Sequence, residues 1–182
     1  GYKVSTTNVA QEQLENHINS NEIDVLLVRS ATTVRKDLID ACPSLKIIGR
    51  GGVGMDNIDV AYARSIGREV INTPAASSQS VAELVMAHLF SISRSVYDSN
   101  RNMPANGATE FKTLKKKYAK GVELRGKTIG IIGFGRIGQS TATYALGCGM
   151  KVVAYDPFLD QATLTLDVAG QQINTTVETT TL

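Results

Sequence analysis

The sequence predicts an α/β protein with parallel strands. Short apolar runs rich in β-branched residues alternate with longer segments of helical periodicity, which is the order of strand, crossover helix and strand. Two of these runs lead directly into glycine-dense loops that are followed by a helical pattern. With 182 residues, 42% hydrophobic and 20% charged, the chain has the composition of a globular protein and the length of one complete domain or two incomplete ones.

Five apolar runs are the expected strands. They cover residues 25–28, 47–48, 70–71, 129–132 and 152–155. Residues 34–41 and 58–66 lie between the first three runs and have short helical patterns that end near Pro43 and Gly67, so we expect compact crossover helices there. Strands joined by such helices pair in parallel.

The most clearly marked helix is expected to begin at Ser80. Ser80 and Glu83 have the spacing of a capping box, in which each side chain accepts the other residue's backbone N–H. Apolar residues then recur at helical spacing and predict a stripe that must pack against something. The stripe consists of Val81, Leu84, Val85, Leu89, Ile92 and Val96.

Residues 100–120 are expected to form a solvated connection, because they are polar, contain Pro104 and Gly107 and carry three consecutive lysines. We place the domain boundary before the Ser80 helix, which gives a first domain over residues 1–76 and a second over residues 77–182. The threonine-rich residues 175–182 carry little information.

Composition excludes several classes of function. The formal net charge of +2 is too small to indicate a nucleic-acid partner, and every apolar run is interrupted before the roughly 18 residues of a membrane span. Cys42 and Cys148 are far apart and form no C-x-x-C pattern, which argues against zinc, any other metal and a disulfide framework. Reduced thiols fit a cytoplasmic protein. The absence of an initiator Met and of a leader leads us to expect that the sequence begins inside a longer chain.

The second glycine loop has the pattern of a dinucleotide-binding turn. The buried run at residues 128–132 is followed by G-x-G-x-x-G and then by a helix of small residues, 140–145. Gly133 would make the tight turn, Gly135 would let the backbone approach a pyrophosphate, and Gly138 would let the helix lie close on the sheet. The amides of Arg136 and Ile137 would then face the phosphate oxygens. The alternative is a loop that binds nothing.

The next strand ends at Asp156, where such a fold places an acid that accepts hydrogen bonds from the adenosine ribose. A carboxylate there would repel the 2′-phosphate of NADP, and no cation follows in Pro157, Phe158 and Leu159, so the position favours NAD. Alternatively, Asp156 is a turn residue before Pro157.

The first glycine loop, around residues 49–54, suits an acidic ligand. Successive glycines such as Gly51 and Gly52 let amides converge on an anion, and Arg50 adds a cation with bidentate geometry. Arg29 follows the run at residues 25–28, so both arginines would lie at one edge of a parallel sheet. Either arginine could instead form a surface ion pair.

These motifs, taken together, resemble a known family. The segment from Gly49 to Asp59, then Asn72-Thr73-Pro74, the Ser80 helix start, and residues 124–128 leading into the G-x-G-x-x-G loop have the order and spacing of D-2-hydroxyacid dehydrogenases. The segments at residues 28–30 and 50–52 are most similar to the phosphoglycerate dehydrogenase branch.

The resemblance implies a flavodoxin-like substrate domain and a Rossmann-type doubly wound NAD-binding domain, both incomplete, with the sheet edge at residues 152–155 uncovered. It assigns NAD contacts to Arg136, Ile137 and Asp156, places Val53 beside the nicotinamide, and gives the amides of Gly52 and Val53 to the substrate carboxylate. The family's catalytic Arg, Glu and His are expected beyond Leu182, so no catalytic residue is assigned here. His17 and His88 fit surface or packing positions better than a general base.

The implied reaction is hydride transfer between a D-2-hydroxy acid and NAD, most consistent with oxidation of 3-phosphoglycerate to 3-phosphohydroxypyruvate at the entry to serine biosynthesis. The resemblance also implies a homodimer, for which the Ser80 helix is our candidate contact. Two alternatives stay open: a glyoxylate or hydroxypyruvate reductase, and an NAD-sensing scaffold of the corepressor type. The three lysines at residues 115–117 suggest nucleic-acid contact only weakly, because such lysines are usually solvated.

Overall fold

The computed structural model describes Gly1 and residues 3–181, and these form two compact units, Gly1–Ser77 and Ser78–Leu182. Each unit contains a parallel sheet, so the predicted class, α/β with parallel strands, is confirmed. Within the described residues, none of the helices combines the length and the apolar character that a membrane crossing requires.

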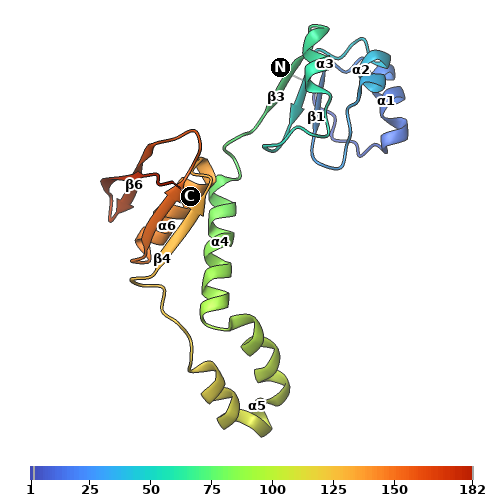
Figure 1. Ribbon diagram of the computed structural model, residues 1–182. Coiled ribbons are helices and arrows are strands. Elements are labelled where there is room, and N and C mark those ends of the chain that lie inside the picture. Colours follow the sequence, from blue (N-terminus) through green and yellow to red (C-terminus); the bar gives the residue numbers. More distant parts are fainter. Residues whose placement is uncertain (2, 182) are drawn as a thin grey trace. The chain divides into compact units, whose positions relative to one another are not determined.

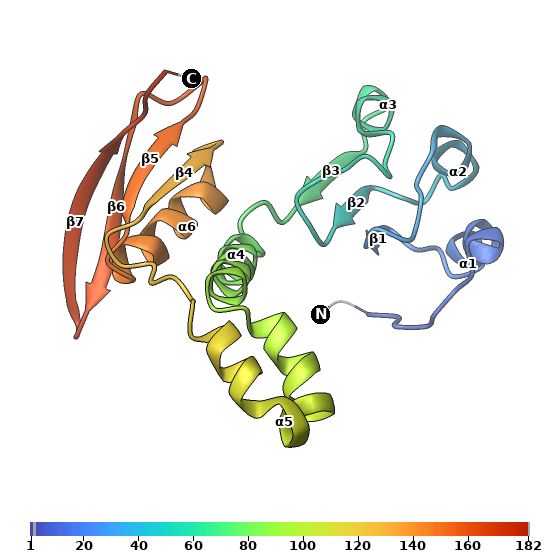
Figure 2. The same ribbon diagram turned by 60° about the horizontal axis from the view of Figure 1, so that its bottom comes forward.

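The first unit is a three-stranded parallel sheet with helices on one side (Figure 2). Its strands are β1 (Val25–Val28), β2 (Ile47–Arg50) and β3 (Glu69–Asn72), paired in the order β1-β2-β3. Its helices are the short 3₁₀ turn η1 (Gln11–Gln13), α1 (Leu14–Ser20), α2 (Lys36–Ala41) and α3 (Val60–Ser65). All three expected strands and both expected crossover helices are therefore present.

The core of the first unit lies between the sheet and its helices. Ile48 and Val70 are opposite in register and are buried with Ile39 and Ala63 from the helices. The other face of the sheet carries Leu27 and is exposed. Because side chains alternate along a strand, burial on one face fixes the register and thereby which residues reach the end of each strand.

The second unit contains a parallel pair, β4 (Thr128–Ile132) and β5 (Lys151–Tyr155), with α6 (Arg136–Gly147) connecting them. The long helix α4 (Ser78–Ser93) packs on α6, where Met86 of α4 is buried with Ala145 and Met150. Figure 1 shows α4 leading into α5 (Val96–Tyr118), which bends back along itself.

Two expectations for α4 are wrong. The helix begins at Ser78, and Ser80 lies inside it, so the expected capping box is not formed. Its buried face is made by Ser78, Ala82 and Met86, and Met86 packs against the small Ala145 of α6. Most of the predicted apolar stripe therefore faces away from the unit; Leu84 is 56% exposed and Ile92 is 78% exposed.

The solvated connection expected at residues 100–120 is also wrong, because residues 100–118 belong to α5 despite Pro104. The helix breaks at Glu110, and a tertiary contact holds its two arms: Asp98 accepts hydrogen bonds from Lys117 Nζ at 2.6 Å and from the Tyr118 hydroxyl at 2.8 Å. These donors hold the pKa of Asp98 below its ordinary value. Local propensity at Pro104 is thus outweighed by contacts between residues distant in sequence.

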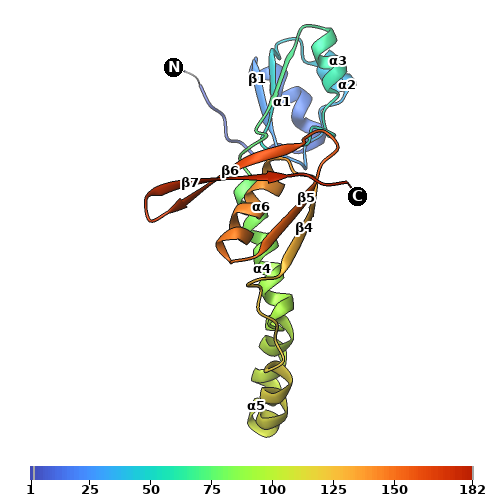
Figure 3. The same cartoon turned by 60° about the vertical axis from the view of Figure 1, so that its left-hand side comes forward.

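The tail forms an antiparallel hairpin that was not predicted, β6 (Gln161–Val168) and β7 (Gln171–Glu178) (Figure 3). Leu164 is buried against Phe134, Ala142 and Ala154. The turn residues Ala169 and Gly170 both have positive φ, as a two-residue hairpin turn of type I′ requires. The sheet edge expected to be uncovered is partly covered, because Ala154 pairs with Thr179.

Candidate functional site

The carboxyl ends of the strands in the first unit bring polar residues to one edge. Val28, Arg50 and Asn72 are directly opposite in register, and each is the last residue of its strand. Arg29 follows β1 at once, and its side chain lies beside Gly51, where an added Cβ would be 3.8 Å from Arg29 Cγ. The two arginines expected at one sheet edge therefore lie there together.

The Arg50 guanidinium is fixed in place by the protein, but not all of its N–H donors are used. One terminal nitrogen donates to Ser30 Oγ at 3.0 Å, and the guanidinium lies so close to Gly52 that any side chain there would collide with it. Its Nε is buried and has no hydrogen-bond partner among the described residues. Buried polar groups are rarely left unpaired, so this donor is an indication that a ligand group or water belongs beside it.

The amides of the first glycine loop are only partly free. Gly51 donates to Val28 O at 2.9 Å, and Gly52 donates to Arg50 O at 3.0 Å. Within the described part of the chain, no acceptor engages the amides of Val53 and Gly54. The available pair is therefore Val53 and Gly54, one residue further along than the Gly52 and Val53 pair that the resemblance implies. Val53 O is itself fixed by Asn72 Nδ2 at 2.7 Å.

Asn57 connects the loop after β2 to the loop after β1. Its side-chain nitrogen donates to Arg29 O at 3.0 Å and to Thr32 O at 2.6 Å, and the residue is 6% exposed. Asn57 thus fixes the segment that carries Arg29 and Ser30, and through Ser30 it supports Arg50. Asp59 closes the same region by accepting from Lys36 N at 2.8 Å and Arg35 at 3.0 Å, which lowers the pKa of its carboxyl.

The second glycine loop has the geometry of an anion cradle. Gly133 has a φ of 91°, which makes the tight turn out of β4, and α6 begins at Arg136. The first-turn amides of a helix have no intrahelical acceptor, and no described group accepts from Gly135, Arg136, Ile137 or Gly138. These amides form the positive end of the α6 dipole.

Two glycines of this loop differ in their surroundings. A Cβ added at Gly138 would collide with the carbonyl oxygen of Gly133, because α6 packs directly on the turn. A Cβ added at Gly135 would meet nothing within 4 Å. Gly138 is thus required by the protein's own packing, whereas the space at Gly135 is left open.

Asp156 lies beside this cradle and is already engaged. Its Oδ2 accepts from Phe134 N at 2.7 Å and its Oδ1 accepts from Phe158 N at 2.8 Å. The turn role considered as the alternative is therefore present. A carboxylate has about four acceptor sites, so two engaged amides leave capacity for ribose hydroxyls.

The predicted site residues fall into two groups, one in each unit. Arg29, Arg50, Gly51, Gly52 and Val53 lie together in the first unit, and Gly133, Gly135, Arg136, Ile137, Gly138 and Asp156 lie together in the second. Sequence reasoning missed Ser30, Asn57 and Gln139, which hold these loops through side-chain hydrogen bonds. Closeness to a glycine loop could have indicated Asn57 and Gln139, and Ser30 directly follows Arg29.

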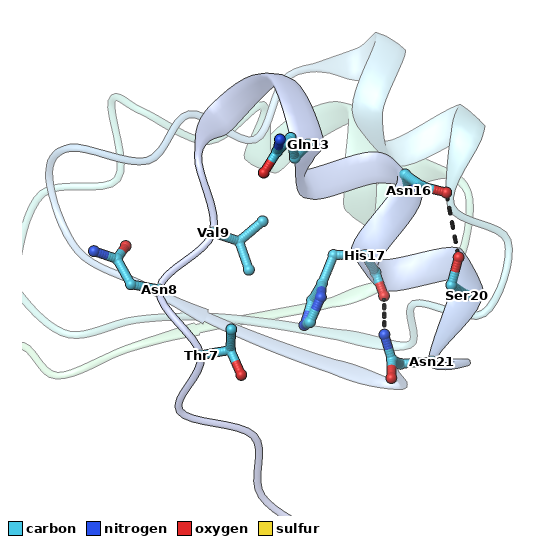
Figure 4. Close-up of a pocket in the computed structure, with 8 residues that line it drawn as sticks. All are labelled: Thr7, Asn8, Val9, Gln13, Asn16, His17, Ser20 and Asn21. Atoms are coloured by element: carbon cyan, nitrogen blue, oxygen red, sulfur yellow. Dashed lines mark hydrogen bonds between the residues drawn. The ribbon is translucent and has the colours of Figure 1, made fainter.

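Other polar clusters do not overlap these groups. A hollow of about 400 Å³ beside α1 is lined by neutral polar side chains, Val9 and His17 (Figure 4). His88 is exposed on α4. Among the described residues, no group of three or more His, Cys, Asp or Glu side chains is arranged to bind a metal ion.

Known proteins resemble this chain over most of its length. A family model described as D-isomer specific 2-hydroxyacid dehydrogenase, catalytic domain, matches residues 1–180. The chain is 51% identical over 138 residues to a hydroxypyruvate reductase of Thermotoga maritima, an alignment that covers 75% of this chain and 42% of the relative. It is 42% identical over 153 residues to a D-3-phosphoglycerate dehydrogenase of Methanocaldococcus jannaschii, covering 84% of this chain and 28% of the relative.

Solved structures give the same result. A D-lactate dehydrogenase from Aquifex aeolicus, complexed with NAD and lactic acid, matches with a TM-score of 0.64 at 30% identity and covers 80% of this chain and 41% of that chain. The predicted flavodoxin-like and Rossmann-type architecture agrees with this neighbour. The chain thus spans less than half the length of these three relatives, and it belongs to the D-isomer specific 2-hydroxyacid dehydrogenase family.

Proposed function

We propose that this chain is the part of an NAD-dependent D-2-hydroxyacid dehydrogenase that binds the cofactor's pyrophosphate and adenosine ribose and an anionic substrate. One observation carries the proposal: no group among residues 1 and 3–181 accepts from the amides at the start of α6, and a carboxylate lies at the end of the next strand. Free amides at a helix N-terminus bind phosphate, and an acid in that place binds ribose hydroxyls.

The cofactor would be held by the second loop. The amides of Gly135, Arg136 and Ile137 would donate to the pyrophosphate, and Gly133 and Gly138 would shape the turn. Asp156 would accept from the ribose with its remaining lone pairs and would repel a 2′-phosphate, which favours NAD over NADP. The Aquifex aeolicus relative, which is a complex with NAD, supports this choice.

The substrate would be held by the first loop. Arg50 and Arg29 supply two cations at one strand edge, while Val53 and Gly54 supply free amides. A substrate with both a carboxylate and a phosphate would use both sets of donors, because guanidinium binds phosphate bidentately and amides bind a carboxylate. These two sets of donors support 3-phosphoglycerate as the substrate. The proposed reaction is its oxidation to 3-phosphohydroxypyruvate, for serine biosynthesis in the cytoplasm.

Bound NAD would supply the hydride acceptor, and the residues of this chain would position both reactants. A fixed orientation of the substrate carbon toward the cofactor is a large part of such catalysis. Proton transfer would be performed by a His paired with a Glu, and an Arg would hold the substrate carboxylate; all three are expected outside this sequence, and neither His17 nor His88 lies in either glycine loop.

A second candidate function is reduction of hydroxypyruvate or glyoxylate. It is favoured by the 51% identity with the Thermotoga maritima hydroxypyruvate reductase. An unphosphorylated substrate would need fewer cations, so Arg29 and Arg50 distinguish the two candidates.

The experiment is NADH oxidation by the full-length protein with 3-phosphohydroxypyruvate, hydroxypyruvate and glyoxylate. We expect the highest kcat/KM with 3-phosphohydroxypyruvate. Preference for hydroxypyruvate would favour the second candidate, and NADH binding without turnover of any 2-oxo acid would contradict the enzyme assignment and favour a scaffold.

We also propose that α4 forms a homodimer contact, because its apolar residues Val81, Leu84 and Ile92 are exposed in the single chain. Leu84→Glu combined with Ile92→Glu should convert the full-length protein from dimer to monomer in sedimentation velocity. An exposed site on β7, Gln172→Glu, is the control. A dimer that survives the double change would exclude this contact.

A further inference from the structure

The peptide bond between Phe134 and Gly135 lies in the second glycine loop. The residue types on either side of it do little to constrain its orientation. Gly133 precedes Phe134 and Gly135 follows it, and glycine allows a wide range of backbone angles at little cost. In a planar peptide, C=O and N–H point in opposite directions. The direction of Phe134 O therefore determines where the Gly135 N–H points.

Side chains from outside the loop fix this peptide and the peptide before it. Gln139 Nε2 donates to Phe134 O at 2.8 Å, and Asp156 Oδ2 accepts from Phe134 N at 2.7 Å. The Phe134 ring is 0% exposed and packs against Ala142 and Leu164. The residue is thus held at its amide, its carbonyl and its side chain.

Gln139 is well placed for this task. It is half-buried, and its own backbone N–H donates to Gly135 O at 2.9 Å, which closes the first turn of α6. Because a carbonyl oxygen only accepts, the side-chain nitrogen must be the atom that faces Phe134 O. Gln139 therefore donates two hydrogen bonds to the loop, one from its backbone N–H and one from its side chain.

We infer that Gln139 is a positioning residue for cofactor binding: its side chain holds Phe134 O so that the Gly135 amide points into the anion cradle. The inference rests on the proposed function, since it presupposes that the cradle binds the cofactor's pyrophosphate. Donors that are already oriented bind the phosphates without a free-energy cost of ordering them. Losing the hydrogen bond from Gln139 to Phe134 O should therefore weaken binding of the phosphates. The nucleoside end of the cofactor, which depends on Asp156, is unaffected.

The test uses Gln139→Met and Gln139→Glu in the full-length protein. Met keeps the length of the side chain and removes the donor, and Glu keeps its shape and polarity but presents only acceptors at pH 7. The control is Gln172→Met, the same chemical change at an exposed position on β7. Calorimetric titrations measure binding of NADH and of adenosine, which lacks the phosphates, and thermal unfolding measures folding.

We expect the Kd for NADH to rise about fivefold in Gln139→Met, the size of one lost hydrogen bond, and more in Gln139→Glu, while the Kd for adenosine is unchanged. Gln172→Met should match the wild type. The inference is overturned if both Gln139 variants bind NADH within about twofold of the wild type. Equal losses for NADH and adenosine, or unfolding of both variants, would also overturn it, because Gln139 would then hold the whole unit together.

These outcomes separate the inference from the proposed function. A wild-type protein that does not bind NADH contradicts the proposed function. A wild type that binds NADH beside Gln139 variants that bind it equally well contradicts only the role of Gln139.

Discussion

The two glycine-rich loops occupy equivalent places, each after a parallel strand, yet they offer different groups to a ligand. The loop after β2 presents the Arg50 guanidinium; Gly51 and Gly52 use their amides internally, and the amides of Val53 and Gly54 have no acceptor among the described residues. The loop after β4 presents a set of amides at the start of α6 that no described group accepts from, with the Asp156 carboxylate beside them. The main feature of the first site is the charge of Arg50, and the main feature of the second is the direction of its backbone amides.

The two loops differ because the distance from each loop to the next helix differs. A 12-residue helix begins directly at Arg136, so several amides converge at its first turn. After β2, the chain makes a further turn before α3 begins at Val60, so no helix start faces the loop and Arg50 must supply the charge. Glycine content alone therefore does not define a phosphate site; the position of the next helix does.

A side-chain amide supports each of the two sites. Asn57 donates to the carbonyl of Arg29, and Gln139 donates to the carbonyl of Phe134. Gln139 fixes backbone that the neighbouring glycines leave free, whereas Asn57 fixes the segment after β1 that carries Arg29 and Ser30. Substitutions in the two loops should therefore show whether the charge of Arg50 affects substrate binding alone and the amides of α6 affect cofactor binding alone.

The largest effect is expected at Gly135. Gly135→Ala should weaken NADH binding about 100-fold, or about 3 kcal/mol, because the added methyl group occupies the space left for the ligand. The melting temperature should not change, since no protein atom lies within 4 Å of that Cβ. Fluorescence titration with NADH and thermal unfolding measure the two effects.

Gly138→Ala is the matched partner of that substitution. Its Cβ would strike Gly133 O, so it should lower the free energy of unfolding by about 1–3 kcal/mol. If Gly135→Ala instead destabilises the fold and leaves NADH binding intact, the loop is not a cofactor site.

Substrate binding by the loop after β2 should depend on the charge of Arg50. Arg50→Ala should raise KM for 3-phosphohydroxypyruvate about 10- to 100-fold, which corresponds to losing a hydrogen bond to a charged group, and should change KM for hydroxypyruvate less. Steady-state kinetics with both substrates measure this, with Arg101→Ala on α5 as the control. An equal rise for the two substrates would indicate that Arg50 binds the carboxylate or only supports the loop.

Asp156 should set cofactor preference. Asp156→Asn should lower the preference for NADH over NADPH about tenfold, because the charge that repels the 2′-phosphate is removed while the side-chain shape is kept. Asp156→Ala should reduce affinity for both cofactors, since Phe134 N also loses its acceptor. An unchanged ratio of NADH to NADPH affinity in both variants would remove Asp156 from this role.

The smallest effect is expected from Asp59, which supports the first loop. Its pKa is lowered from 3.8 by the Lys36 N–H and Arg35, so its contribution to stability is present above that value and is lost as the pH falls through the folded-state pKa. The melting temperature of the wild type should exceed that of Asp59→Asn at about pH 6 and approach it at about pH 3. A difference that stays constant with pH would show that the carboxylate makes no such contribution.

Local sequence patterns were sufficient to predict the strands of both parallel sheets and the place of both glycine loops. These features depend on the spacing of apolar residues and on glycines set between a strand and a helix. The hairpin at residues 161–178 also had such a pattern, since Ala162, Leu164 and Leu166 alternate with polar residues before Ala169-Gly170.

Tertiary contacts, by contrast, determined which face of α4 is buried, that residues 100–120 are helical, and which loop amides are free. Ala82 and Met86 are buried because α6 presents small residues opposite them, and α5 forms because Asp98 meets Lys117 and Tyr118. Gln139 gains its role only when the turn places Phe134 O within reach. Such outcomes depend on partners distant in sequence or on the direction of a single peptide, and neither leaves a pattern in the local sequence.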